Sequence, residues 1–481
     1  MPLADMVDIL KPDLCIIGAG ALGISLAIDA RARNLSVVLV QRPGDEPGNT
    51  ARDEAVRAAF MASAARAHAM RTASALGLKD TDPKPSFRAI GERASAIADA
   101  VAPQTAPDRL AALGVILRDE PAAFSDRQTL RVGTTLVRAG QFVLATGSHP
   151  TTPDLPGHDK VQSFNPDTIL ANMRKLSHLV VIGGDATALE LAQAYRRLGS
   201  DVTVVPHGPL LEGFDPEPVA ILLRSLRQEG VAILDGASVT AILPRSQGTG
   251  IAIAHADGSL DTLDVSHILL AFGRVPDLDP ELLEQARLRR DPARPDFLQL
   301  SPQGQTSNGR VTAIGGAAGI YDAQSALRQA AIVLQRATGA AAGRINPLLV
   351  PHSVNTSPAI AQIGLVETAN GLRPGQMVLR ANASETTAAR ASADLPGNTK
   401  LITTSDGTIL GAAMIGAHSS ETIAMLAVAL ERGMGAADLA GLLLPPASPA
   451  VQLVDLGRQF IAQHRPSDWA RRRAALRRLL P

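Results

Sequence analysis

Two segments of the chain join a short apolar run to a glycine-rich turn and a helix-forming stretch, and this pattern constrains the fold most. In the first segment, the run Leu14–Ile17 leads into glycines spaced G-x-G-x-x-G. Gly18 permits a sharp turn, Gly20 lets the backbone approach a pyrophosphate, and Gly23 lets the helix pack close to the strand. A second apolar run, Val37–Val40, follows at the expected place. The segment therefore predicts a βαβ unit that binds a dinucleotide.

The second strand of this unit is followed by Gln41, where such units usually carry a carboxylate for the adenosine ribose. A glutamine amide can still hydrogen-bond a hydroxyl, but it brings no charge. We therefore expect a dinucleotide site with weakened ribose recognition.

The second segment repeats the pattern in eroded form. A strand at Leu179–Ile182 leads to Gly183 and Gly184, and a strand at Val202–Val205 follows the helix. Asp185 occupies the position of the middle glycine. A carboxylate there is unfavourable beside a pyrophosphate unless it points away or caps the helix. The alternative to a nucleotide site is a helix-capping loop that binds nothing.

The residues after the second strand of this unit leave the choice of nucleotide open. The segment "VVPHG" carries neither the acid that selects NAD nor an arginine that selects NADP. His207 is the side chain there that can contact a 2′-phosphate weakly.

Composition bounds the remaining possibilities. With 481 residues, the chain is long enough for about three domains of roughly 150 residues each. Lysine plus arginine equals aspartate plus glutamate, at 46 each, so overall charge favours neither nucleic acid nor membrane. The N-terminus lacks a signal-peptide pattern, and no apolar run approaches the length of a membrane span. We therefore expect a cytoplasmic protein.

Cys15 is the only cysteine, and it lies inside the first apolar run. A structural disulfide or a redox dithiol within the chain is therefore excluded, and a buried core cysteine is expected. The histidines show no metal-ligand spacing, so no metal site is predicted. His418 and Glu421 are expected at the start of a helix, where they indicate local capping rather than acid–base catalysis.

Further motifs, taken in order, give the chain a family resemblance. "FVLATGSHPTTPDLPG" contains Thr146 and Gly147, and "ILLAFGRVPDLD" contains Gly273, Arg274 and Pro276. With "VIGGDATALELAQAYRRLGSDVTVV" and "VPHSVNTSPAIAQIGLVE", the chain resembles the flavin-dependent pyridine nucleotide–disulfide oxidoreductases, mercuric reductase and dihydrolipoamide dehydrogenase among them. The resemblance implies an α/β fold with two Rossmann-like doubly wound domains, for FAD and NAD(P), plus an α+β C-terminal dimerisation domain.

The resemblance also implies domain boundaries. The FAD-binding domain is expected at residues 1–152 and 275–343, with the NAD(P)-binding domain of residues 153–274 inserted in it. The dimerisation domain is expected at residues 344–465, and a basic tail of residues 466–481 follows.

The redox centre of the family is missing. Its two cysteines, four residues apart, fall near Glu46 and Ala51, and a small shift in alignment finds no cysteine either. The lysine that the family pairs with the glutamate matching Glu190 is also missing. Without sulfur there is no thiolate for a charge-transfer complex or a mixed disulfide. We therefore expect no disulfide, lipoamide or mercuric reductase activity from this chain alone.

Other family positions differ as well. Pro445 and Ala450 stand where the family has its catalytic histidine and the glutamate that orients it. Gly316 stands where an aspartate holds the ribityl and phosphate region of the flavin. These losses weaken cofactor contacts as well as the dithiol centre.

Two hypotheses on function follow. The first is an FAD-dependent NAD(P)H oxidoreductase without a redox-active disulfide, which passes electrons from reduced flavin to an unknown small-molecule acceptor, since the hydride chemistry belongs to the cofactor. The alternative is a non-catalytic pseudoenzyme that keeps the fold as a scaffold or regulatory binding protein, either with FAD bound or without it. No catalytic residue is predicted. The expected cofactor-binding residues are Gly18, Gly20, Gly23, Gln41, Thr146, Gly147, Gly183, Gly184, Glu190, Gly273, Arg274 and Gly315. Arg274 has a second interpretation, as a residue that holds the domain junction.

A homodimer and a small-molecule electron acceptor are the expected partners. The tail "RPSDWARRRAALRRLLP" predicts a basic amphipathic helix, with Ser467 as its cap. Such a helix either contacts an anionic membrane surface or a partner weakly, or packs on its own dimer.

Overall fold

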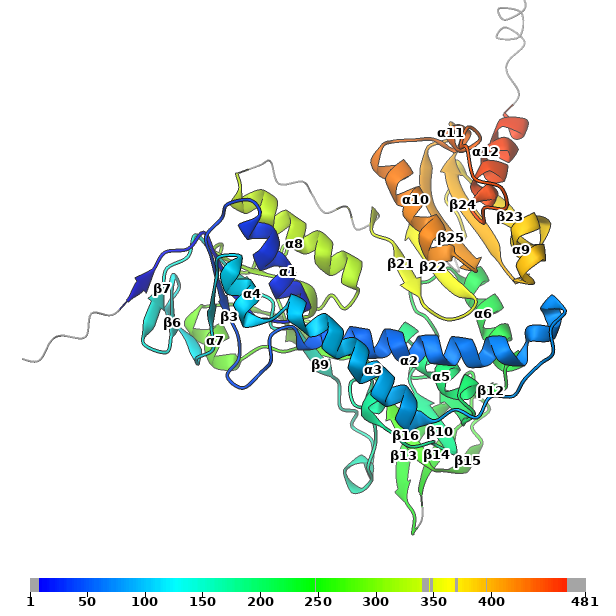
Figure 1. Ribbon diagram of the computed structural model, residues 1–481, viewed down its shortest axis with the longest axis horizontal. Coiled ribbons are helices and arrows are strands. Elements are labelled where there is room, and N and C mark those ends of the chain that lie inside the picture. Colours follow the sequence, from blue (N-terminus) through cyan, green and yellow to red (C-terminus); the bar gives the residue numbers. More distant parts are fainter. Residues whose placement is uncertain are drawn as a thin grey trace, which may run out of the picture. The chain divides into compact units, whose positions relative to one another are not determined.

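The computed structural model describes residues 8–246, 248–339, 346, 349–367, 371–394 and 396–464. The basic helix predicted for the tail, with Ser467 as its cap, lies outside the described residues. The chain forms two compact units, whose elements are labelled in Figure 1. The N-terminal unit comprises Met1–Thr72, Asp80–Leu210 and Glu229–Pro347, and the C-terminal unit comprises Ala73–Lys79, Leu211–Gln228 and Leu348–Pro481.

A parallel sheet of strand order β20-β8-β2-β3-β4 is the centre of the first part of the N-terminal unit. Four of its strands are buried along their whole length, as expected for a sheet covered on both faces, while the edge strand β4 is partly exposed. Helices α1 (Ala21–Arg31) and α8 (Ala323–Ala337) share a core with Leu14 and Ile16 on one face. The opposite face, with Cys15 and Ile17, packs against residues of a second sheet, β1-β7-β6-β5. The sheet strands are β2 (Leu14–Ile17), β3 (Val37–Val40), β4 (Val115–Arg118), β8 (Gln141–Leu144) and β20 (Val311–Ala313).

A second parallel sheet, β12-β11-β10-β16, follows the same plan. Helix α5 (Ala186–Arg197) connects its two central strands, and an antiparallel sheet, β13-β14-β15, shares a core with β10 and β16. The predicted strands of both βαβ units are confirmed to within one residue. The strands are β10 (His178–Ile182), β11 (Asp201–Val205), β12 (Val231–Ile233), β13 (Ser238–Pro244), β14 (Thr249–Ala254), β15 (Leu260–Val265) and β16 (His267–Leu270).

The long helix α2 (Asn49–Arg71) pairs with α3 (Phe87–Val101) and packs against α5 of the second βαβ unit (Figure 1). Phe60 of α2 and Tyr195 of α5 have ring centroids 5.2 Å apart, and Phe87 of α3 packs on both rings. Aromatic contacts of this kind stabilise a buried interface beyond the area they remove from water. The helix therefore links the two βαβ units.

The C-terminal unit contains an antiparallel sheet of order β21-β22-β25-β24-β23. Helices α10 (Ser419–Glu431) and α12 (Val451–Gln463) contribute to its main core, while α6 (Pro216–Gln228) contacts β22 and β25. The strands are β21 (His352–Val354), β22 (Ala359–Gly364), β23 (Gln376–Asn382), β24 (Asn398–Thr404) and β25 (Ile409–Gly416).

Shorter elements complete the fold. Two of them, β9 (Ser148–Pro150) and β17 (Arg274–Pro276), form an antiparallel ribbon. The others are β1 (Ile9–Leu10), β5 (Ala122–Asp126), β6 (Thr129–Val132), β7 (Thr135–Val137), β18 (Arg290–Asp291), β19 (Arg294–Leu298), α4 (Pro107–Ala112), α7 (Pro280–Gln285), α9 (Thr387–Ser392) and α11 (Ala436–Leu439).

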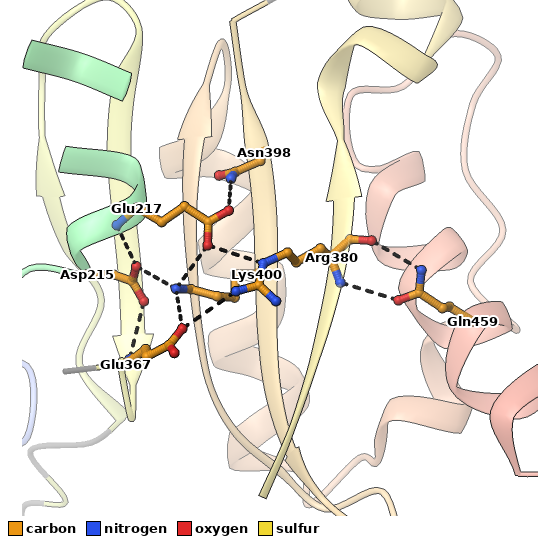
Figure 2. Close-up of polar contacts among 7 residues, drawn as sticks. All are labelled: Asp215, Glu217, Glu367, Arg380, Asn398, Lys400 and Gln459. Atoms are coloured by element: carbon orange, nitrogen blue, oxygen red, sulfur yellow. Dashed lines mark hydrogen bonds and ion pairs between the residues drawn. The ribbon is translucent and has the colours of Figure 1, made fainter. Parts of the chain in front are cut away.

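A buried ion cluster ties the chain just before α6 to the C-terminal sheet (Figure 2). The Nζ atom of Lys400 on β24 lies 2.7 Å from Asp215 Oδ1, 3.2 Å from Glu217 Oε2 and 2.9 Å from Glu367 Oε2. The side chains of Lys400 and Asp215 are 1% and 0% exposed. Arg380 on β23 adds a second cation, with its Nε 3.2 Å from Glu217 Oε2. Because each carboxylate faces a cation, the buried charges are compensated.

Candidate functional site

The first predicted turn, residues 18–23, connects β2 to α1 and is called the first cradle. Gly18 has φ of +117°, and a Cβ atom there would lie 2.2 Å from the carbonyl oxygen of Ala145. A Cβ on Gly23 would lie 2.0 Å from the carbonyl oxygen of Gly18. The tight turn and the close helix packing therefore require these two glycines.

Thr50, in the first turn of α2, lies at the N-terminus of α1. Its Oγ1 accepts a hydrogen bond of 2.7 Å from the backbone N–H of Ala21, and a Cβ on Gly20 would lie 3.1 Å from the same oxygen. The N-terminus of α1, where a helix carries a partial positive charge, is thus bordered by the start of α2, which already takes one of its N–H groups.

Two buried polar atoms lie just after the carboxyl ends of the strands that flank the first cradle. Gln41, 5% exposed, follows β3, and its Nε2 donates a 2.7 Å hydrogen bond to the carbonyl oxygen of Asp45. Within the described part of the chain, Gln41 Oε1 and Thr146 Oγ1 have no hydrogen-bond partner. Buried polar atoms are rarely left in this state, and these two lie beside the first cradle, where a bound molecule could supply their partners.

The ribbon of β9 and β17 lies between Gly147 and Gly273. The Gly147 carbonyl accepts from Asp277 N, and the Gly273 carbonyl accepts from Thr151 N, at 3.0 Å each. Because these carbonyls hold the ribbon, both glycines belong to a junction of chain segments in the N-terminal unit.

Arg274 is fully engaged in the same ribbon. Its Nε and Nη2 donate to the hydroxyl and carbonyl oxygens of Ser148 at 2.8 Å and 2.7 Å, and Nη1 lies 2.7 Å from Asp167 Oδ1. These contacts favour the structural interpretation of Arg274, as a residue that holds the junction.

Gly315 and Gly316 come shortly after β20, the strand that pairs with β8 on the Gly147 side of the first cradle. The N–H of Gly315 donates to Gln329 Oε1 at 2.7 Å. A Cβ on Gly316 would lie 2.6 Å from the carbonyl carbon of Gly147. The backbone is packed so closely here that an aspartate at position 316 would clash with the neighbouring peptide.

The second turn, residues 183–188, connects β10 to α5 and is called the second cradle. Gly183 has φ of +149°, and a Cβ there would lie 2.2 Å from the carbonyl oxygen of Ala271. Gly184 faces Leu210, whose Cδ2 would lie 3.2 Å from an added Cβ. The turn thus repeats the geometry of the first cradle at its first glycine.

Asp185 caps α5. Its Oδ1 accepts a hydrogen bond of 2.8 Å from the N–H of Ala188, which is the capping alternative weighed from the sequence. Burial raises the pKa of the Asp185 carboxyl, while hydrogen bonds from α5 and the positive charge of Arg57 oppose the rise. Glu190 is buried one turn further along the same helix.

Arg57 and Asp53, one turn apart on α2, were not singled out from the sequence. Arg57 Nη1 lies 3.4 Å from Thr187 Oγ1, at the start of α5. Burial and the nearby Asp167 carboxylate raise the pKa of Asp53, against the charges of Arg57 and Arg52. The signal available in the sequence was the seven-residue spacing from Thr50 to Arg57, which places both residues on one face of a helix.

The segment expected to match the dithiol positions ends in the first turn of α2. Glu46 is exposed before the helix and Ala51 lies within it. Cys15 is fully buried in β2, where burial raises the pKa of its thiol. A protonated, inaccessible thiol is a poor nucleophile.

The C-terminal positions also lack acid–base groups. Pro445 is exposed, and Ala450 is buried just before α12. His418 precedes α10, and its Nδ1 lies 3.9 Å from Glu421 Oε2, too far for a hydrogen bond. His418 lines a cavity of about 410 Å³ with Thr422, Gln452 and other residues of this unit.

Among the described residues, no group of histidine, cysteine, aspartate and glutamate side chains is arranged to hold a metal ion. No helix in the described ranges is long and apolar enough to cross a membrane.

Two βαβ cradles joined by one long helix, followed by an antiparallel sheet unit, are an arrangement typical of enzymes that bind two dinucleotides. Residues 12–330 match the family model "Pyridine nucleotide-disulphide oxidoreductase", and residues 350–452 match the dimerisation domain of the same family. The chain therefore belongs to the pyridine nucleotide-disulphide oxidoreductases. The predicted family and fold class are confirmed. Members of this family depend on FAD and NAD(P).

Individual relatives agree with this assignment. A mercuric reductase from Streptomyces lividans is 29% identical over 367 residues, which are 74% of this chain and 76% of the relative. A dihydrolipoyl dehydrogenase from Geobacillus stearothermophilus is 30% identical over 331 residues, which are 66% of this chain and 68% of the relative. The crystal structure of LpdA from Mycobacterium tuberculosis has a TM-score of 0.83 and 22% identity, and the match covers 94% of this chain and 100% of that one.

Proposed function

We propose that this protein is an FAD-dependent NAD(P)H oxidoreductase that works without a redox-active disulfide. Reduced flavin would pass its electrons directly to a small-molecule acceptor, such as a quinone or another nucleotide. The observation that carries the proposal is the pair of buried, unpartnered acceptor atoms at the first cradle, Gln41 Oε1 and Thr146 Oγ1, within the described residues. The single cysteine, buried in β2, supports the absence of dithiol chemistry.

The residues of the first cradle fit FAD. Gln41 Oε1 is an acceptor with no donor among the described residues, and a ribose hydroxyl is a suitable donor for it. The N-terminus of α1 favours a pyrophosphate. When bound, FAD supplies the acceptor for a hydride from NAD(P)H. The residues proposed to hold FAD are Gly18, Gly20, Gly23, Gln41, Thr146, Gly147 and Gly315, and those proposed for the nicotinamide nucleotide are Gly183, Gly184 and Glu190. Gly273 and Arg274 would hold the junction between the two sites.

The boundaries near residues 152, 274 and 343 stay predictions. The dimerisation domain supports a homodimer. A small-molecule acceptor, NADH or NADPH as the hydride donor and a cytoplasmic location are parts of the same proposal.

A second candidate function, a scaffold that keeps the fold without turnover, is favoured by Gly316. A Cβ there would meet the carbonyl carbon of Gly147 at 2.6 Å, so the aspartate of the family cannot be accommodated without a shift of the backbone. Weak FAD binding would then be a built-in property of this chain.

Thr146→Val is expected to weaken FAD binding by about five- to tenfold, the loss of one hydrogen bond of roughly 1 kcal/mol. The stability of the apoprotein should stay the same or rise, because the variant removes a buried hydroxyl without a partner among the described residues. Thr312→Val, which removes a buried hydroxyl that accepts from Gln141, is the matched control and should destabilise the apoprotein. Titration with FAD and thermal unfolding of apoprotein check both. Unchanged FAD affinity in Thr146→Val would contradict this role.

The proposed function is tested by the absorption spectrum of the purified protein, followed by anaerobic NADH and then NADPH. Bleaching of the flavin band by either nucleotide, in protein pretreated with iodoacetamide, is expected because no thiol takes part. A protein that takes up no FAD, or a bound flavin that neither nucleotide reduces, would replace the proposal with the scaffold function.

A further inference from the structure

Helix α2 begins beside the first cradle and carries a cationic side chain, that of Arg57, beside the second cradle. Thr50 Oγ1 contacts Ala21 N at the start of α1, and Arg57 Nη1 lies 3.4 Å from Thr187 Oγ1 at the start of α5. Their spacing of seven positions along α2 corresponds to about 10 Å of helix. The guanidinium of Arg57 is thus held at the N-terminus of a helix from the other βαβ unit.

The second cradle carries a carboxylate, that of Asp185, at a position where the first cradle has a glycine, Gly20. Asp185 stands at the position of the middle glycine, and its carboxylate occupies the N-terminus of α5, where a nucleotide diphosphate is bound in such folds. Two negative groups in the same place repel each other, and more strongly where they are partly withdrawn from water. Burial raises the pKa of the Asp185 carboxyl, and the hydrogen bond from Ala188 and the charge of Arg57, which lies beside Thr187, lower it.

The contact of Arg57 with Thr187 is not what holds α2 to α5. At 3.4 Å it is longer than a good hydrogen bond. The interface has stronger contacts elsewhere: Phe60 packs on Tyr195, and Arg71 donates to the carbonyl of Arg197 at 2.6 Å. Arg57 is therefore available for another interaction at small structural cost.

We propose that Arg57 is a positioning residue of the second cradle, which offsets the charge of Asp185 and donates hydrogen bonds to the diphosphate of NADH or NADPH. This inference rests on the proposed function, because it assigns the nucleotide to the second cradle. Arginine suits the role, since its planar guanidinium presents several donors to phosphate oxygens and stays charged at any physiological pH.

The test is a fluorescence titration of FAD-loaded protein and of apoprotein with NADPH and, separately, with NADH. The variants are Arg57→Gln, Arg57→Lys, Asp185→Asn and the double variant of Arg57→Gln with Asp185→Asn. Asparagine still caps a helix, so Asp185→Asn removes the charge and keeps the structure. Arg52→Gln is the matched control, because Arg52 lies on the same helix but pairs at the surface with Glu46 and Asp99.

Arg57→Gln is expected to raise the Kd of the preferred nucleotide about tenfold, Arg57→Lys less, and Arg52→Gln within about twofold of wild type. Adding Asp185→Asn to Arg57→Gln should recover the part of the loss that comes from the uncompensated carboxylate, but not the part that comes from the lost hydrogen bonds to the diphosphate. Added salt should weaken wild-type binding more than binding by Arg57→Gln.

A purely structural role gives a different result: a lower Tm for Arg57→Gln, with an unchanged Kd and no recovery by Asp185→Asn. That result would overturn the inference, as would a wild-type protein that binds neither nucleotide. Binding that depends on Arg57 without reduction of the flavin would leave the inference standing and remove the proposed function. Flavin reduction with equal Kd values in wild type and Arg57→Gln would leave the proposed function standing and overturn the inference on Arg57.

Discussion

Replacing Lys400 with methionine is expected to destabilise the C-terminal unit by about 3–5 kcal/mol, the usual cost of leaving a buried charge without its partner. Asp215 is 0% exposed and lies 2.7 Å from the Lys400 ammonium, so its carboxylate would lose its nearest cation without gaining water. Arg380 contacts Glu217 and Glu367, and no contact of it with Asp215 is seen among the described residues. The second cation therefore does not substitute for the first.

Hydrogen exchange of the β24 amides is the measurement suited to this variant, because it reports the C-terminal unit even where unfolding of the whole chain is not two-state. Lys160→Met, at an exposed position, is the matched control and should leave exchange unchanged. If Lys400→Met also exchanged like wild type, the cluster would be irrelevant to stability. Restoration by a second substitution, Asp215→Asn, would show that the uncompensated carboxylate is the cause.

The same cluster predicts a pH window for the stability of this unit. Hydrogen bonding to Lys400 holds the pKa of Glu367 below its ordinary value of 4.5, so its contribution is present above pH 4.5 and lost as the pH falls. Burial alone would lower the pKa of Lys400, but its hydrogen bonds to Asp215 and Glu367 outweigh this and raise it above 10.5. The contribution of Lys400 is therefore present below pH 10.5 and lost only as the pH rises further. The protection of the β24 amides, relative to the same amides in an unfolded chain at the same pH, should therefore fall at both limits in wild type. In Lys400→Met it should change much less.

Gly18→Ala and Gly183→Ala are expected to separate the two halves of the proposed function. In each variant the new Cβ would lie 2.2 Å from a carbonyl oxygen, that of Ala145 or of Ala271, at a positive φ. The strain and the clash together amount to roughly 2–5 kcal/mol of local destabilisation. Gly18→Ala should therefore lose FAD. Gly183→Ala should keep the flavin spectrum but lose its reduction by NADH and NADPH.

The control for this pair is Gly44→Ala. Gly44 also has a positive φ, +84°, but an added Cβ would meet no atom within 4 Å, so only backbone strain is introduced. FAD content by absorbance and anaerobic reduction by each nucleotide are measured on all three variants. Equal FAD content in Gly18→Ala and wild type would place the flavin outside the first cradle.

The local features of this fold could be predicted from the sequence, and the features that depend on distant residues could not. The strands of both βαβ units follow from apolar runs of four residues beside glycine-rich turns, which are local signals. The capping role of Asp185 was one of two outcomes that local chemistry allowed. Arg57 was not found, because its position beside α5 depends on how α2 packs against the second βαβ unit, within the N-terminal unit of the chain.

The Lys400 cluster shows the same limit. Nothing near Lys400 in the sequence indicates burial, and its partners Asp215 and Glu367 come from segments far away in the chain. A charged residue in an alternating strand is ordinarily assigned to the solvent face. The ammonium meets the carboxylates because β24, the start of α6 and the segment after β22 come together in the C-terminal unit.

The ion cluster joins residues that are synthesised at different times, because its members are far apart in the sequence. Asp215 leaves the ribosome roughly 10–40 s before Lys400, at ordinary rates of about 5–20 residues per second. Until β22 and β25 have emerged, helix α6 lacks the strands against which it packs, and its apolar residues Val219, Leu222 and Leu226 have no sheet to cover them. The nascent chain thus carries an apolar helix and an acidic segment whose packing and charge partners lie in the last third of the polypeptide. A messenger truncated before that point would yield a product that chaperones and proteases recognise, rather than a smaller working protein.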